Sequence, residues 1–382
     1  AWNAADVRGE VERLIAAAGI ITDPAVRIEL AEDLTARALS RCEPLLPRDG
    51  VPEHIRAWTS GPVLAVEADL TARLASRATE RPAGVRGPDP IPPVDIAVGD
   101  TRLDPGQAAA VAALAGRRRL VVIEGAAGAG KTTTLAATRT LLAEQGRRLV
   151  VVTPTLKAAK VVAAEVGAIA GSAARLAFEY GWRWNDDGAW TRLPVGHPDP
   201  ATGRDYAGPA DGARLRAGDL LVCDEAGMLD QDTAQALLTV ADECRVHVAL
   251  LGDRHQLAAV GRGGVLDLAA AQVDPAAHLT LAGVHRFTRT DATGRTTPDT
   301  DYADLTLAMR AGENPGTVFD ALLGRGQIRL HPDPQTLREA LAAAAADGYA
   351  AGKRVAVVVA TREQAAALSA AIRDRLVTEG RV

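Results

Sequence analysis

The stretch VVIEGAAGAGKTTTL, residues 121–135, decides the fold class of this chain. From Gly125 it runs through four residues to Gly130, Lys131 and Thr132, which is the spacing of a phosphate-binding P-loop. An apolar run precedes the motif and a helical pattern follows it, as the motif requires. We therefore expect a strand, a glycine-rich loop and a helix whose N-terminal N–H groups face a phosphate.

The residue types in this loop predict how a nucleoside triphosphate is held. Lys131 is expected to reach the β- and γ-phosphates, and the Thr132 hydroxyl to ligate Mg²⁺. The expected nucleotide-binding residues of the loop are Gly125, Gly128, Gly130, Lys131, Thr132 and Thr133. The sequence therefore predicts ATP and Mg²⁺ as cofactors.

Short apolar runs alternate with helical patterns on both sides of the loop. The runs are LVVIEG (120–125), RRLVVVTP (147–154), DLLVCDE (219–225) and VHVALLGD (246–253). Fully apolar runs separated by helices indicate a parallel sheet with both faces covered. The expected fold class is α/β, and a later run, KRVAVVVAT (353–361), is a further candidate for a buried strand.

Acidic residues follow one of these strands, in the segment LLVCDEAGM. Asp224 and Glu225 would lie beside the P-loop, because the carboxyl ends of parallel strands share one edge of a sheet. Asp224 is expected to hold Mg²⁺ and Glu225 to polarise the attacking water. In the next motif, GDRHQLAAVGRGG, Gln256 is an uncharged group suited to detecting the γ-phosphate.

The totals exclude several function classes. The net charge of −5 argues against a generally basic nucleic-acid binder, so DNA would need a local groove. No apolar run reaches the length of a membrane span. We therefore expect no membrane partner. The three cysteines, Cys42, Cys223 and Cys244, are widely spaced, so we expect no disulfide partner and a cytoplasmic location. No guanine-reading N-K-x-D pattern occurs, which disfavours a GTPase.

Aromatic residues gather in FEYGWRWNDDGAW, residues 178–190. Turn residues at its middle, with rough alternation on both sides, predict a two-stranded hairpin inside an insert at about 172–217. Two interpretations stay open for Trp182, Trp184 and Trp190: they stack on unpaired bases, or they hold a small insert together.

Four segments in order resemble superfamily 1 helicases of the RecD-like branch: the P-loop, TPTLKAAK (153–160), DEAGM and GDRHQL. With VHRF (284–287), they are most similar to the helicase portion of conjugative relaxases of the TrwC/TraI/TraA (MobF) type. The resemblance implies a RecA-like P-loop NTPase fold with two motor domains.

The resemblance also implies site residues. Gln107 would contact adenine, although a glutamine at a helix start is the plainer interpretation. Arg286 would reach the γ-phosphate from the second motor domain, unless it is a surface arginine. The implied single-strand contacts are Thr153, Pro154, Thr155 and Lys157, with a solvated helix face as the alternative for the lysine.

On this basis the sequence predicts a helical domain (1–80), a proline-rich linker (81–100), a first motor domain (101–275) and a second, truncated one (276–382). The implied function is a 5′-to-3′ DNA helicase acting in conjugation, with a relaxase domain in the same parent chain. A stand-alone RecD-like repair helicase and a single-stranded DNA-binding module without turnover remain the alternatives.

Overall fold

The structure is a computed structural model of the chain. It describes residues 1–46, 54–79, 97–98, 101–185, 188–259, 261–291 and 293–381. The chain divides into two compact units, unit 1 (Ala1–Arg310) and unit 2 (Ala311–Val382).

The centre of unit 1 is a six-stranded sheet in which every neighbouring pair is parallel. Its strands are β5 (Leu120–Gly125), β6 (Leu149–Thr153), β7 (Ile169–Ser172), β10 (Leu220–Cys223), β11 (His247–Gly252) and β12 (His278–Leu281). The strand order is β12-β5-β11-β10-β6-β7. The four apolar runs identified in the sequence supply the central strands, because a sheet covered on both faces needs apolar residues at every position.

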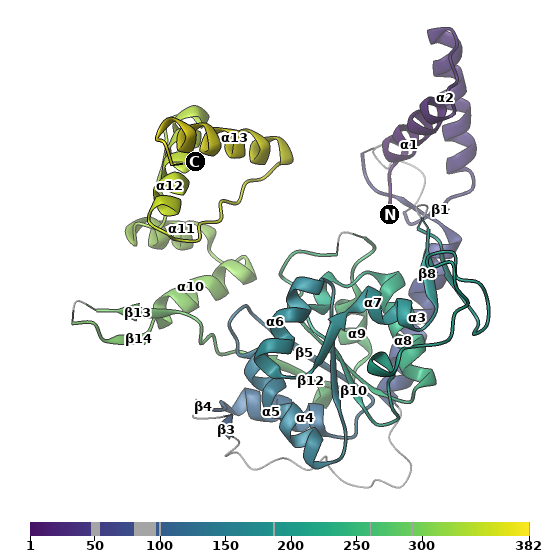
Figure 1. The fold of residues 1–382 in the computed structure, drawn as a ribbon. Coiled ribbons are helices and arrows are strands. Elements are labelled where there is room, and N and C mark those ends of the chain that lie inside the picture. Colours follow the sequence, from purple (N-terminus) through teal and green to yellow (C-terminus); the bar gives the residue numbers. More distant parts are fainter. Residues whose placement is uncertain are drawn as a thin grey trace. The chain divides into compact units, whose positions relative to one another are not determined.

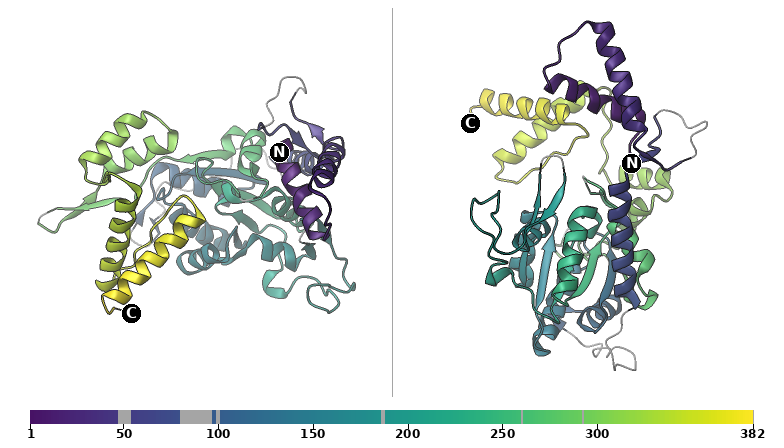
Figure 2. Two further views of the ribbon diagram at one scale, coloured as in Figure 1. Left: turned by 90° about the horizontal axis from the view of Figure 1, so that it is seen from above. Right: turned by 90° about the vertical axis from the view of Figure 1, so that its right-hand side faces the viewer.

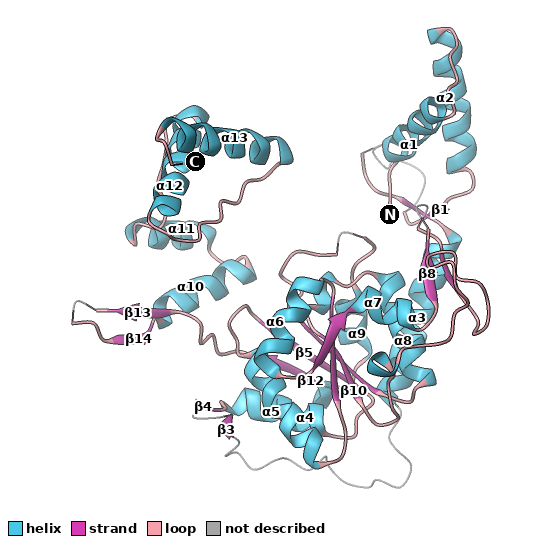
Figure 3. Ribbon diagram, in the orientation of Figure 1, coloured by secondary structure: helices cyan, strands magenta, loops and turns pink. Residues whose placement is uncertain are grey.

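Helices cover both faces of this sheet (Figures 1 and 3). One layer holds α4 (Pro105–Ala115), α5 (Lys131–Glu144) and α6 (Leu156–Val166); the other holds α3 (Gly61–Thr79), α7 (Ala173–Glu179), α8 (Gln231–Glu243) and α9 (Val265–Gln272). Each layer has its own apolar core, and alternate residues of a strand enter opposite cores. Val121 and Ile123 face the first layer, whereas Val122 faces the second. The predicted α/β fold with a covered parallel sheet is confirmed.

The N-terminal helices do not form a separate domain. Helices α1 (Ala4–Ala17) and α2 (Pro24–Leu39) pack on each other around Val11, Ile15 and Ala31. Asp23 caps α2, with Pro24 at its first position. Helix α3, in contrast, belongs to the layer on the motor sheet, and its Leu70 and Leu74 are fully buried there. Figure 2 shows α3 lying lengthwise against this side of unit 1.

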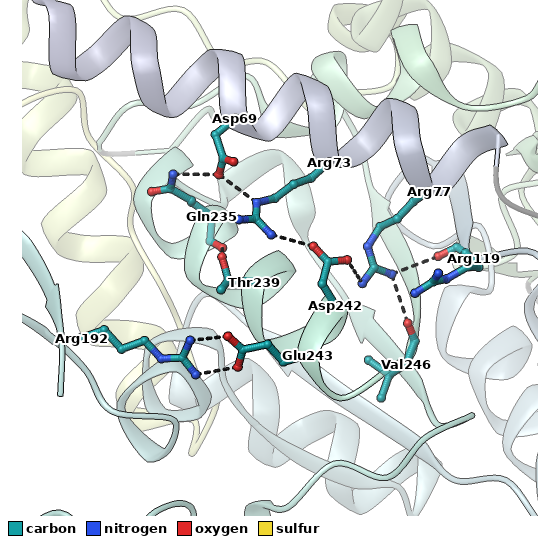
Figure 4. A network of polar contacts seen from close by, with 10 residues as sticks. All are labelled: Asp69, Arg73, Arg77, Arg119, Arg192, Gln235, Thr239, Asp242, Glu243 and Val246. Atoms are coloured by element: carbon teal, nitrogen blue, oxygen red, sulfur yellow. Dashed lines mark hydrogen bonds and ion pairs between the residues drawn. The ribbon is translucent and has the colours of Figure 1, made fainter. Parts of the chain in front are cut away.

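A polar network joins α3 to α8 (Figure 4). Asp242, near the end of α8, accepts from Arg73 at 2.7 Å and pairs with Arg77 at 2.6 Å. Arg77 is 2% exposed, and its guanidinium also donates to the carbonyl of Val246. The next residue of α8, Glu243, instead pairs with Arg192 of the hairpin in an exposed setting.

We expect Asp242→Ala to lower the free energy of unfolding by about 3–5 kcal/mol, because it leaves the buried charge of Arg77 without a carboxylate. Urea unfolding measures the loss. Glu243→Ala is the matched control, since its ion pair is exposed and worth less than about 1 kcal/mol. Equal losses for the two variants would contradict this account of the network.

Short antiparallel pairs accompany the main sheet in unit 1. They are β1 (Glu43–Pro44) with β2 (Trp58–Thr59), β3 (Ala97–Val98) with β4 (Thr101–Arg102), β8 (Trp182–Trp184) with β9 (Trp190–Arg192), and β13 (Thr288–Thr290) with β14 (Thr296–Pro298). Among the described residues of unit 1, 3₁₀ turns are η1 (Asp211–Ala213), η2 (Ala226–Met228) and η3 (Pro275–Ala277). The β8–β9 pair confirms the predicted hairpin, of which Asp186 and Asp187 lie outside the described residues.

Unit 1 ends in α10 (Thr300–Ala311), and unit 2 is helical where it is described, with α11 (Pro315–Gly324), α12 (Pro334–Ala350) and α13 (Arg362–Thr378). The predicted strand at 353–361 is wrong for this structure, since its residues pair with no strand and Val358 is 90% exposed. An extended apolar segment needs a neighbouring strand for its backbone hydrogen bonds, and the described part of unit 2 offers helices only.

The predicted domain boundaries also need correction. The boundary at 275/276 divides unit 1, because β12 completes the first sheet beside β5. The boundary at 80 separates α3 from the sheet that it covers. The predicted linker, 81–100, lies outside the described residues except for 97–98, which form β3. No described helix is long and apolar enough to cross a membrane.

Candidate nucleotide-binding site

The P-loop joins β5 to α5, as the sequence predicts. Gly128 and Gly130 have φ angles of +86° and +80°, which side-chain-bearing residues rarely adopt. Space is equally limiting, since a Cβ on Gly130 would lie 2.0 Å from Nε2 of Gln107. Gly130 is also the N-cap of α5, and it has no side chain with which to cap the helix. The first backbone N–H groups of α5 are therefore available to bind an anion.

Lys131 lies at the mouth of this loop. Its Nζ donates to the carbonyl of Gly125 at 3.2 Å and is 3.7 Å from Oε1 of Glu225. The side chain is only 11% exposed, so its ammonium is aimed along the loop instead of into bulk solvent. Thr132 and Thr133 are half-buried in the first turn of the same helix. The structure thus brings the predicted lysine and the predicted catalytic carboxylate together.

The two acidic residues stand directly after β10. The N–H of Asp224 donates to the carbonyl of Val152 on β6, which fixes the strand end, and the N–H of Glu225 donates to Oδ1 of Asp224 at 3.0 Å. Glu225 has a φ of +56°, an uncommon and strained value for a residue with a side chain. Such backbone strain clusters at functional sites.

Burial, and secondly the neighbouring Glu225, raise the pKa of Asp224 to about 6, while Lys131 acts in the opposite direction. The nearby ammonium of Lys131 therefore offsets the cost of burying this carboxylate only in part. This donor set fits Mg²⁺, which takes one or two protein oxygens and keeps phosphates and waters as its other ligands. Asp224 and Thr132 would be those protein ligands.

Arg286 follows β12 in unit 1, so the expectation that it comes from a second motor domain is not met. The backbone N–H of His285 donates to the carbonyl of Gly128 at 2.9 Å. A Cβ on Gly128 would lie 2.5 Å from the Cβ of Arg286. The exposed Arg286 side chain therefore starts at the P-loop itself, within reach of a phosphate held there.

Gln107 is buried at the start of α4, where it takes part in a capping box with Asp104. Its Oε1 accepts from the N–H of Asp104 at 3.0 Å. Its Nε2 is the atom that crowds Gly130. Gln107 therefore does have a capping role at the start of α4, and its side-chain amide also lies against the P-loop.

A second ion-pair cluster, which sequence reasoning missed, lies behind the P-loop. Glu124, the residue before Gly125, pairs with Arg254 and, at 2.6 Å, with Nε2 of His278. Hydrogen bonding from Arg254, more than any other contact, lowers the pKa of Glu124 from 4.5 to about 2. The cluster ties β5 to β12 and to the loop that carries Gln256.

This cluster predicts a pH-dependent stability. The folded pKa of Glu124 is below its unfolded value, so its contribution is full above pH 4.5 and is lost as the pH falls toward 2. We expect Glu124→Gln to lower the free energy of unfolding at pH 7 by about 2–3 kcal/mol, with a smaller difference from the wild type below pH 4.5. Urea titrations at pH 7, 5 and 4 test it; a difference that grows toward acid would contradict the pairing.

The predicted single-strand contacts lie after β6, at the start of α6. Thr153 needs correction, because it is fully buried and its hydroxyl donates to the carbonyl of Thr155 at 2.7 Å. It shapes the loop and its side chain cannot reach a strand of DNA. Thr155 caps α6, and both it and Lys157 are exposed, while Pro154 is half-buried.

The hairpin aromatics contact one another. Trp184 and Trp190 are cross-strand partners with ring centroids 4.7 Å apart, and Phe178 meets Trp184 edge-on. Trp182 is half-buried and packs on the core that α8 and α3 share, whereas Trp184 is 45% exposed. Both interpretations of the cluster thus have a residue that suits them: Trp182 holds the insert, and Trp184 presents a ring surface.

Comparisons with known proteins match residues 102–333 to a protein family described as an AAA domain. No curated protein matches the chain. Among solved structures it is similar to Pif1 helicase from Candida albicans, with 16% identity, 61% of this chain and 49% of that chain covered, and a TM-score of 0.37. A Bacteroides sp. Pif1 in complex with ADP-AlF4 has 19% identity, 53% and 45% covered, and a TM-score of 0.30. The chain thus spans about half the length of these two structures.

Proposed function

The chain belongs to the AAA domain family through residues 102–333, and from that premise we propose that it is an ATP-dependent DNA helicase of superfamily 1. Membership of this family makes it a nucleotide-binding enzyme of the ATPase class. The proposed motor moves 5′ to 3′ along single-stranded DNA. We further propose that it serves conjugative transfer in the cytoplasm, beside a relaxase domain of its parent chain, on the strength of the motif resemblance.

One observation carries the proposal: Lys131 Nζ lies between the P-loop carbonyl of Gly125 and the carboxylate of Glu225. A triphosphate seated on the N-terminus of α5 would displace these contacts and take the ammonium for its β- and γ-phosphates. Glu225 would then be released to orient water toward the γ-phosphate. Asp224 and Thr132 would hold Mg²⁺, which supplies charge neutralisation at the phosphates.

DNA would follow the exposed residues at the start of α6 and the hairpin. The cap residue Thr155 and Lys157, at the second position of α6, are both exposed. Cycles of ATP binding and product release at the P-loop would change the grip on the strand, as closing motions do in other motors.

The test is ATP turnover with and without single-stranded DNA. We expect DNA to stimulate turnover, and Lys131→Ala to abolish it while the chain stays folded by circular dichroism. Lys353→Ala, in unit 2, is the control lysine change. DNA binding with no turnover in the wild type would favour the alternative, a binding module with a helicase-like fold. A nicking activity of the parent chain would separate a relaxase from a stand-alone helicase.

Trp184→Ala is expected to weaken single-stranded DNA binding about 5- to 150-fold, because one base loses a stacking surface worth roughly 1–3 kcal/mol. Fluorescence anisotropy of a labelled oligonucleotide measures it. Thermal unfolding should change little, since Trp184 is 45% exposed. Trp182→Ala is the contrasting variant and should lower stability first. If Trp184→Ala destabilises the chain and leaves DNA affinity unchanged, the cluster is structural only.

A further inference from the structure

One buried carboxylate lies between the candidate γ-phosphate sensor and the last helix of unit 1. Asp253 follows β11 and is 3% exposed. It accepts from the N–H of His255 at 3.1 Å and from Nε2 of Gln256 at 3.2 Å. The carboxylate therefore holds the side-chain amide that the sequence assigns to γ-phosphate detection.

The same carboxylate binds an arginine from a distant part of the chain. Arg310, in the last turn of α10, donates from Nε to both oxygens of Asp253, at 2.8 and 2.9 Å. Its side chain is only 23% exposed, and the partner is nearly inaccessible to water, so this is a well-shielded ion pair. Unit 1 ends at Arg310, and unit 2 begins with the next residue.

The loop that carries Gln256 is packed tightly on the catalytic side. A Cβ on Gly227, two residues after Glu225, would lie 2.9 Å from the carbonyl oxygen of Asp253. Arg254, the residue after Asp253, binds Glu124 beside the P-loop. Asp253 and Arg254 are both held in place by these contacts. The exposed Gln256 side chain is therefore the part of the loop that is free to reorient.

Gln256 and Arg310 thus share one acceptor group. If the amide turns toward a γ-phosphate, Asp253 loses one of the two donors at its Oδ2, and Arg310 and the N–H of His255 are left to compensate the buried charge. A change in the amide therefore alters the hydrogen bonding of the residue that anchors α10. In reverse, the position of α10 sets the orientation of the carboxylate that holds the amide.

We propose that Arg310 is a positioning residue: through Asp253 it orients Gln256 toward the γ-phosphate and transmits the presence of that phosphate to α10, after which unit 2 begins. The inference rests on the proposed function for its ligand, ATP. Arg310 itself touches no nucleotide in this scheme.

The experiment uses the full chain and the variant Arg310→Gln. Affinities for ADP and for a non-hydrolysable ATP analogue are measured by titration, and hydrogen exchange of α10 is followed with each ligand. In the wild type we expect the ATP analogue, and not ADP, to change exchange in 300–311. In Arg310→Gln that change should vanish, and affinity for the analogue should fall about five- to tenfold with ADP binding unchanged.

Three further variants separate positioning from plain stability. Arg310→Lys keeps a cation near Asp253 and should recover part of the preference for the analogue. Gln256→Ala should lose the same preference, with no further loss in the double variant, because the two residues act in one chain of contacts. Arg289→Gln, at an exposed position of β13, should behave as the wild type.

The outcomes are distinguishable. A wild type that binds neither nucleotide overturns the proposed function and this inference together. A wild type that prefers the analogue, beside an Arg310→Gln variant with the same preference and the same exchange response, overturns this inference alone. If Arg310→Gln and Arg310→Lys lose affinity for ADP and for the ATP analogue equally, with lowered melting temperatures, the role of Arg310 is structural only and the inference is overturned.

Discussion

We expect Arg286→Ala to lower kcat for ATP hydrolysis by about 10³- to 10⁵-fold and to leave nucleotide affinity nearly unchanged. That is the range typical of an arginine that stabilises charge on a transferred phosphoryl group. The expectation rests on position: the Arg286 backbone lies against Gly128, and the side chain is exposed at the mouth of the P-loop. The charge that it would neutralise grows in the transition state, so binding of ATP should not depend on it.

The measurement is steady-state turnover at saturating ATP together with a separate binding titration. Arg289→Ala removes the same charge three residues further along, from the exposed β13, and should keep wild-type turnover. Arg286→Lys should restore only part of the rate, since an ammonium lacks the planar fork of the guanidinium. If Arg286→Ala changes affinity and kcat equally, or neither, the residue is not acting on the transition state.

Glu225→Gln is expected to reduce turnover by about 10²- to 10⁴-fold, the usual effect of losing a positioned general base. Nucleotide binding should be retained or tightened, because the change removes a negative charge facing the γ-phosphate. It also removes the second largest cause of the raised pKa of Asp224. The variant should therefore trap the nucleotide without hydrolysing it.

Single-turnover kinetics with labelled ATP separates the two effects. Glu144→Gln, at the exposed end of α5, is the matched substitution and should leave both binding and turnover as they are. A Glu225→Gln chain that hydrolyses ATP at the wild-type rate would show that another group orients the water. A variant that no longer binds ATP would instead point to damage of the strained turn at Glu225.

The sequence predicted those parts of the site that are local in the chain. The P-loop, the Asp224–Glu225 pair and the hairpin each combine a turn with its flanking elements within a short window, so their residue types alone specify them. The partner strand of a short apolar run is not encoded in that run. This is why β12 was expected in a second domain and 353–361 was expected to be a strand.

The missed contacts have the same origin. Glu124 and Arg254 are 130 residues apart, and Asp253 and Arg310 are 57 apart. The residue type of one partner in such a pair does not indicate which residue will be the other partner. The pairs form only when parallel strands and a later helix come together at one edge of the sheet. Thr153 illustrates the opposite error: a motif position was taken as a surface contact, although the strand that carries it is buried.

Helix α3 has a practical consequence for anyone cutting this chain into pieces. The family match begins at residue 102, which invites a truncation there, yet Leu70 and Leu74 close the motor core from outside that region. Removing them uncovers apolar surface worth roughly 1.5–3 kcal/mol per leucine, together with the carboxylate of Asp242. A soluble minimal ATPase should therefore start before Gly61, and a fragment starting at 102 should aggregate during purification.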